Sequence, residues 1–149
     1  MLINENLIAV NLPASDKPQA IRILAEKAAS AGRIDNVAKY TAAVLQRESD
    51  FSTAIGFGAA ISHGKSDSVI EPFLMYASIK SIDWQAQDNE PVSMIFLIGV
   101  PADASASIHL QILARISRLL MRNEFRTALR SADTAACVLK VLTDYEVNF

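Results

Sequence analysis

Few side chains of this chain could do chemistry near neutral pH, and two of them are histidines. His63 and His109 are the only histidines among the 149 residues, and imidazole is the side chain whose charge ordinarily changes closest to pH 7. His63 follows a β-like run and directly precedes Gly64-Lys65-Ser66-Asp67, which has the composition of a loop. Functional side chains often sit where a strand meets a loop. His63 is therefore a candidate functional residue, and the simpler interpretation is a surface histidine in a turn.

His109 lies on a predicted helix, in a stripe with Ile112, Leu113, Ile116 and Leu120. That spacing is typical of a histidine packed against the core. His109 is also in the first turn, where backbone N–H groups and the helix dipole favour an anion and disfavour imidazolium. A neutral imidazole at such a place is a reasonable neighbour for a phosphate.

Arg47 comes at the predicted end of another helix, followed by Glu48. It could be a favourable cation at a helix C-terminus, or half of a solvated pair with Glu48. Its functional interpretation is a guanidinium fork for a phosphoryl group. Cys137 stands among alanines and aliphatic residues on a predicted helix, which indicates a buried structural thiol.

Several familiar chemistries are excluded. Gly56-Phe57-Gly58-Ala59-Ala60-Ile61 lacks the third glycine of a dinucleotide fingerprint, and the chain has neither a phosphate-binding P-loop motif nor a G-x-S-x-G elbow. Ser62 and His63 are adjacent in an extended segment, so their side chains should point to opposite faces and not form a nucleophile–base pair. The histidines show no metal-binding spacing, so we expect neither a metal nor a cofactor.

The elements that must position these residues alternate between extended and helical patterns, which predicts an α/β domain with a sheet covered by helices. The predicted strands are Leu7–Asn11, Ala54–Ile61, Pro72–Ile79 and Ser93–Val100. The predicted helices run from a cap at Ser15 or Asp16 to Gly32, from a cap at Asp35 to about Arg47-Glu48, from a cap at Ser107 over Ile108–Met121, over Glu124–Arg130, and over Thr134–Asp144.

Composition limits the class of protein. The length suits one domain over residues 1–149. A net charge of −2 gives no basic footprint for nucleic acid. The longest apolar stretch, Met94–Val100, is far short of the ~20 residues that span a bilayer. The start has no signal-peptide pattern and there is one cysteine, so we expect a cytoplasmic protein without direct membrane insertion.

Two stretches resemble one family. The first is Arg47-Glu48-x-x-x-x-Thr53-x-Ile55-Gly56-x-Gly58-x-Ala60-Ile61-x-His63-Gly64; the second runs from Pro91 to Pro101 and on through the segment Ile108–Leu120. Both are similar to the fructose/mannitol family of enzyme IIA domains, components of the bacterial phosphoenolpyruvate-dependent sugar phosphotransferase system. The likeness spans nearly the whole chain. One departure is Ser62, where the family usually has proline before its active histidine.

The resemblance implies a single domain with a mixed β-sheet and helices on both faces. It implies that His63 accepts a phosphoryl group from the phosphocarrier protein HPr, forming a tele-phosphohistidine, and passes it to an EIIB domain that works with a membrane EIIC. By the same resemblance, His109 is the second active-site histidine and Arg47 is the family arginine near the phosphohistidine. Because phosphoryl transfer needs donors for the phosphoryl oxygens, we expect Arg47, His109 and backbone N–H groups around Gly64 to supply them. The alternative within the family is a regulatory, nitrogen-related EIIA that signals through its phosphorylation state.

Overall fold

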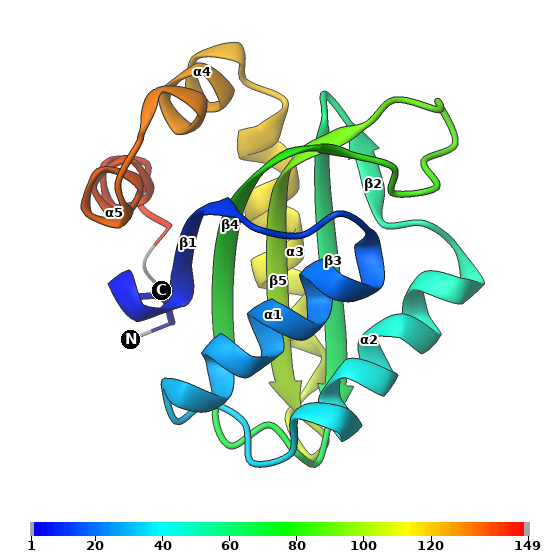
Figure 1. Cartoon of the computed structure of the whole chain (residues 1–149). Helices are drawn as coiled ribbons and strands as arrows, with labels where there is room; N and C mark the ends of the chain where they lie inside the picture. The colour runs from blue at the N-terminus through cyan, green and yellow to red at the C-terminus, as the bar shows by residue number, and fades with distance from the viewer. Residues whose placement is uncertain (1, 148–149) are drawn as a thin grey trace.

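The computed structural model describes residues 2–147, and a five-stranded sheet forms its centre (Figure 1). The strands are β1 (Ile8–Leu12), β2 (Ala54–Gly56), β3 (Ala59–Ser66), β4 (Phe73–Ile82) and β5 (Val92–Pro101). Their order is β1-β4-β5-β3-β2, with β1/β4 and β3/β5 parallel and β4/β5 and β2/β3 antiparallel. The predicted mixed sheet is confirmed.

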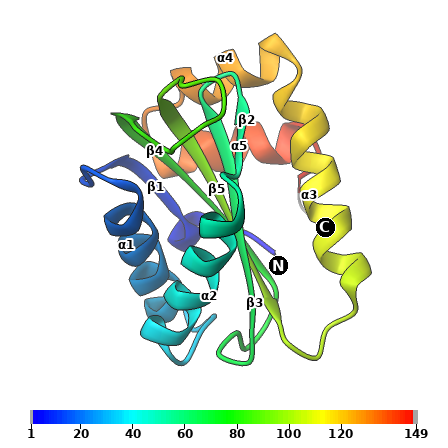
Figure 2. The same cartoon turned by 90° about the vertical axis from the view of Figure 1, so that its right-hand side faces the viewer.

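Helices cover both faces of the sheet, as predicted (Figure 2). The helices α1 (Lys17–Ser30) and α2 (Val37–Asp50) lie on one face. On the other are α3 (Ala106–Leu120) and α5 (Ala135–Asp144), with α4 (Asn123–Ser131) between them in the chain. A short 3-10 turn, Glu5–Leu7, precedes β1.

Side-chain caps set several helix starts. Asp16 accepts a hydrogen bond from the Gln19 N–H at 2.8 Å, as one of the two predicted caps. The second helix is capped by Asn36, whose side chain accepts from the Lys39 N–H at 3.0 Å, so the prediction of Asp35 is wrong by one residue. The third helix begins two residues earlier than predicted, at Ala106 after Ser105.

β3 runs further than its sequence indicates. Gly64-Lys65-Ser66 was predicted as loop, yet all three residues pair in parallel with β5, Gly64 opposite Gly99. Glycine is needed at 64 for close packing, because a Cβ there would lie 2.8 Å from Val44 Cγ2 of α2. His63 is therefore held within a strand that pairs with β5 rather than at the start of a loop.

The apolar run of β5 is buried on both faces, as its composition predicts. On the α1/α2 face, the Phe73 ring covers Gly99, and the Tyr40 hydroxyl donates to the Ile98 carbonyl at 2.8 Å. Cys137 differs from the prediction: it is exposed, because α5 turns Val138 and Leu142 toward the core and leaves the preceding residue outside.

Candidate functional site

The β3 strand sends Ser62 and His63 to opposite faces of the sheet, as the alternation of a strand requires. The Ser62 hydroxyl donates to Glu48 of α2, whereas the His63 imidazole meets His109 of α3. The two imidazole centroids are 4.5 Å apart with the ring planes at 54°. Two histidines far apart in the sequence are thus in contact.

The hydrogen bonding of His63 defines which ring nitrogen can react. Nδ1 lies 3.3 Å from the Ile61 carbonyl oxygen. A carbonyl only accepts, so Nδ1 carries the hydrogen in the neutral ring, and the lone pair is left on Nε2. Nε2 is therefore the nitrogen poised for nucleophilic attack or ligation.

Burial lowers the pKa of His63 below its ordinary 6.5, and the charges of His109 and Arg47 lower it further. The Ile61 carbonyl and Glu48 act in the opposite direction. The pKa of His109 is lowered by burial first, then by Lys65 and Arg47. Both rings are therefore neutral at pH 7, and His63 keeps the free lone pair that a nucleophile needs.

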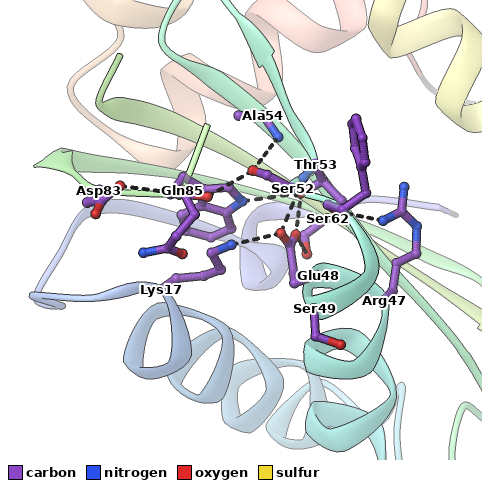
Figure 3. Close-up of polar contacts among 12 residues, drawn as sticks. Lys17, Arg47, Glu48, Ser49, Ser52, Thr53, Ala54, Ser62, Asp83 and Gln85 are labelled. Carbon is purple, nitrogen blue, oxygen red and sulfur yellow. Dashed lines mark hydrogen bonds and ion pairs between the residues drawn. The ribbon is translucent and has the colours of Figure 1, made fainter. Parts of the chain in front are cut away.

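Arg47, the third residue predicted for the site, lies in the last turn of α2. Its guanidinium donates to the Phe51 carbonyl at 2.7 Å, and its charge acts on both histidines. The alternative of a solvated pair with Glu48 is wrong, because the two neighbouring side chains diverge: Arg47 points away from Glu48 (Figure 3).

His109 lies on the apolar stripe of its helix, as its spacing predicts. Its helix buries Ile112, Ile116 and Leu120 against the sheet, so the imidazole is on the core-facing side of α3. Its Nε2 is buried and has no hydrogen-bond partner among residues 2–147. Buried polar atoms nearly always have a partner, and a nitrogen without one next to His63 can serve a group that arrives there.

Glu48 is the residue that the sequence interpretation missed. Its carboxylate is buried and accepts from Lys17 Nζ at 3.1 Å, from the Thr53 N–H at 3.2 Å, from the Thr53 hydroxyl, and from the Ser62 hydroxyl at 2.7 Å (Figure 3). The Trp84 indole N–H donates to the Thr53 hydroxyl at 3.2 Å. We call Lys17, Glu48, Thr53, Ser62 and Trp84 the Glu48 cluster.

A signal for Glu48 exists in the sequence. Tyr40, Thr41 and Val44 precede it by eight, seven and four positions, and all four side chains are buried on one face of α2. That spacing continues the inward stripe of the helix to a carboxylate. A buried carboxylate in turn requires a cation and hydrogen-bond donors, which this cluster supplies.

Within the described residues, no three His, Cys, Asp or Glu side chains gather to hold a metal ion. None of the helices described is long and apolar enough to cross a membrane.

Comparison with known proteins gives a consistent family. Residues 1–145 match the model of the family described as "Phosphoenolpyruvate-dependent sugar phosphotransferase system, EIIA 2". The chain is 39% identical to the "PTS system fructose-specific EIIA component" of Haloferax volcanii, covering 93% of this chain and 90% of that protein. It is 36% identical to the "Nitrogen regulatory protein" of Bradyrhizobium diazoefficiens, covering 95% and 92%.

Solved structures share the fold. The nitrogen regulatory protein IIA-Ntr from Neisseria meningitidis superposes with a TM-score of 0.87 at 22% identity, covering 95% of this chain and 96% of that one. The mannitol enzyme IIA of Escherichia coli, solved in complex with phosphorylated enzyme IIB, gives 0.80 at 18% identity, covering 95% and 97%.

Proposed function

The chain belongs to the EIIA 2 family of the phosphoenolpyruvate-dependent sugar phosphotransferase system, and on that premise we propose that it is a phosphoryl carrier whose His63 accepts the phosphoryl group from phospho-HPr and transfers it to a cognate EIIB. The observation that carries the proposal is the pair of half-buried, neutral imidazoles 4.5 Å apart, with Nε2 of His63 free to react. No other pair of candidate groups in the described residues has this arrangement.

The chemistry needs positioning more than acid–base catalysis. The lone pair on Nε2 of His63 attacks the phosphorus in line, a new N–P bond forms, and the N–P bond to the donor histidine breaks with its electron pair staying on the donor. One imidazole replaces another, so the step is nearly isoenergetic and reversible. The product is a tele-phosphohistidine, and Nδ1 keeps its hydrogen bond to Ile61 throughout.

Three kinds of donor can hold the phosphoryl oxygens. The Arg47 guanidinium supplies a planar fork, and Nε2 of His109, which has no partner among the described residues, can donate to one oxygen. β2 pairs only with Ala59 and Ala60. Beyond Ile61 the described β3 edge has no strand beside it, so backbone N–H groups near Gly64 can contribute. Fixed donors of this kind are each worth about 2–4 kcal/mol in a transition state.

Transfer onward requires a protein partner that reaches His63. A solved mannitol enzyme IIA is in complex with phosphorylated enzyme IIB, which supports an EIIB as the acceptor here, with an EIIC as its membrane component. Ile108 and Leu110, which flank His109 on α3, are exposed. Apolar side chains beside the reactive group suit a small, transient protein interface. The proposal places the relay in the cytoplasm, where phosphoenolpyruvate is made and used.

We place the chain in sugar uptake first, and the alternative is a regulatory EIIA. The fructose-like pattern of α3 and the 39% identity to a fructose-specific component favour uptake. The 36% identity to a nitrogen regulatory protein, with similar coverage, favours signalling. A purified fructose EIIB distinguishes the two: it should remove the phosphoryl group within seconds if the chain serves uptake, and leave it in place if the chain only signals.

The direct test is labelling with phosphoenolpyruvate, enzyme I and HPr, followed by intact mass measurement. Wild type should gain one acid-labile phosphoryl group, and His63→Gln should gain none. His109→Gln should accept the group poorly or fail to hand it on. A phosphorylated His63→Gln protein would show that the site assignment is wrong.

A further inference from the structure

The Glu48 cluster joins three elements directly behind the histidine pair. Lys17 comes from α1, Glu48 from the last turn of α2, and Ser62 from β3 (Figure 3). The side chains of Lys17 and Glu48 are only 7% and 3% exposed, and Ser62 is fully buried. Ser62 is the residue immediately before His63, so a contact that fixes Ser62 also fixes the backbone to which the imidazole is attached.

We infer that Glu48 is a positioning residue for His63: anchored by Lys17, its carboxylate holds the Ser62 hydroxyl and so fixes the strand segment that presents the imidazole to His109 and to the incoming phosphoryl group. The expected effect on the phosphorylation rate rests on the proposed function, whereas the effect on the position of the His63 ring does not.

The position of Glu48 on α2 explains how its hydrogen bond to Ser62 can affect the site. Arg47 directly precedes Glu48 on α2, so the Ser62–Glu48 hydrogen bond of 2.7 Å links the helical turn that carries the guanidinium to the strand that carries the imidazole. Without it, α2 and β3 could shift against each other at this point. A displacement of about 1 Å in a positioned group can cost 10²-fold in rate.

Ser62 stands where the family usually has proline, and its hydrogen bond to Glu48 can replace the restraint that proline would provide. Proline restrains a backbone through its ring, and serine lacks that restraint. In this chain a hydrogen bond to a buried carboxylate supplies a restraint instead, and hydrogen bonds to charged groups are the stronger class. The restraint therefore comes from tertiary structure and is open to removal by a single atom change.

Lys17 has a second part in the cluster. A phosphoryl group on His63 adds negative charge on one face of β3, and the Glu48 carboxylate of α2 lies against the opposite face. The Lys17 ammonium at 3.1 Å compensates that carboxylate, so the phosphorylated site does not face an unpaired anion. The titratable and charged groups that act on His63 are then His109 on α3 and Arg47 and Glu48 on α2.

The decisive variant is Ser62→Ala, which removes the hydroxyl and leaves the ion pair. Ser66→Ala is the matched control, because Ser66 is a buried serine on the same face of β3 whose hydroxyl bonds to Ser68 at 2.7 Å instead. With phospho-HPr as donor, Ser62→Ala should lose about tenfold in the phosphorylation rate at saturation, with KM unchanged, and Ser66→Ala should stay within about twofold of wild type. A Ser62→Ala rate within twofold of wild type overturns the inference.

A second variant tests the charge without leaving an unpaired ion in the interior. The double variant Lys17→Met/Glu48→Gln removes both charges together. Because the Glu48 charge raises the pKa of His63, an NMR titration should give a lower His63 pKa in the double variant than in wild type. In Ser62→Ala, which removes the hydrogen bond itself, the His63–His109 ring contact, read from nuclear Overhauser effects, should weaken. An unchanged ring contact in Ser62→Ala would overturn the positioning role, and an unchanged pKa in the double variant would overturn the effect of the Glu48 charge on His63.

These readouts separate the inference from the proposed function. If wild type fails to take up a phosphoryl group, the proposed function fails, while the ring-contact measurement in Ser62→Ala still decides whether the Ser62–Glu48 hydrogen bond positions His63. If wild type is phosphorylated and Ser62→Ala is indistinguishable from it, the positioning inference alone fails.

Discussion

Breaking the Lys17–Glu48 pair should destabilise the fold far more than breaking a surface pair of the same length. The Lys17–Glu48 distance is 3.1 Å with side-chain exposures of 7% and 3%; the Lys140–Asp144 distance is 3.0 Å with exposures of 76% and 58%. The two pairs match in distance and differ in burial. Lys17→Met and Lys140→Met therefore isolate the effect of taking an ion pair out of water.

The expected loss follows from three contributions. Removing one partner of a buried ion pair costs about 3–5 kcal/mol, because the other charge stays behind uncompensated. Lys17 is the first residue of α1, and removing a cation from a helix N-terminus returns up to about 1 kcal/mol. The Thr53 and Ser62 donors still stabilise Glu48. We therefore expect Lys17→Met to lose about 2–4 kcal/mol, or roughly 10 °C in Tm for a domain of this size.

Urea unfolding followed by circular dichroism measures this free energy. Lys140→Met should lose less than about 0.5 kcal/mol. Lys17→Met/Glu48→Gln should be no less stable than Lys17→Met, since it leaves no unpaired charge. Lys17→Met within 0.5 kcal/mol of wild type would refute the view that this pair is a buried electrostatic unit.

Three further outcomes follow from the structure. Burial lowers the pKa of His63 and His109 below 6.5, so the unfolded chain binds protons more readily than the folded one. The free energy of unfolding should therefore be at its full value above about pH 6.5 and decline as the pH falls through the lowered pKa values. Urea titrations at several pH values measure this decline. Gly99→Ala places a Cβ 2.1 Å from Cε2 of Phe73 and should cost about 1–3 kcal/mol in the same assay; wild-type stability would contradict the packing described. Arg47→Lys keeps the charge and loses the planar fork, so the phosphorylation rate should fall about tenfold in rapid-quench measurements, and an unchanged rate would remove Arg47 from the site.

The sequence predicts the fold well wherever local pattern and tertiary structure agree. Continuous apolar runs identify β4 and β5, and helical spacing identifies α1 and α5, because burial is what both patterns record. Gly64-Lys65-Ser66 shows where agreement ends. Its composition is that of a loop, and only pairing with β5 makes it a strand. The prediction that Cys137 is buried is wrong for a related reason. Its neighbours are apolar, but which of them faces the core depends on how α5 lies on the sheet.

For the candidate site as well, the sequence predicts the residues but not their contacts. His63, His109 and Arg47 can be proposed from residue type and from the family resemblance, but their proximity needs the sheet and α3 to bring separate segments together. Glu48 could not be assigned a partner from sequence, since Lys17 lies on another helix. Long-range pairs of this kind have no local signature. Besides its place in the Arg47-Glu48 stretch of the family resemblance, the inward stripe of α2 is the sequence feature that points to Glu48.

We propose that Nε2 of His63 carries the phosphoryl group, and imidazole NMR can locate the N–P bond. Two-dimensional ¹H–¹⁵N spectra of the chain phosphorylated by phosphoenolpyruvate, enzyme I and HPr assign the N–P bond to one nitrogen of one ring. The structure predicts phosphorus on Nε2 of His63, with Nδ1 still protonated and bonded to the Ile61 carbonyl. Phosphorus on Nδ1 of His63, on His109, or on neither ring would contradict it.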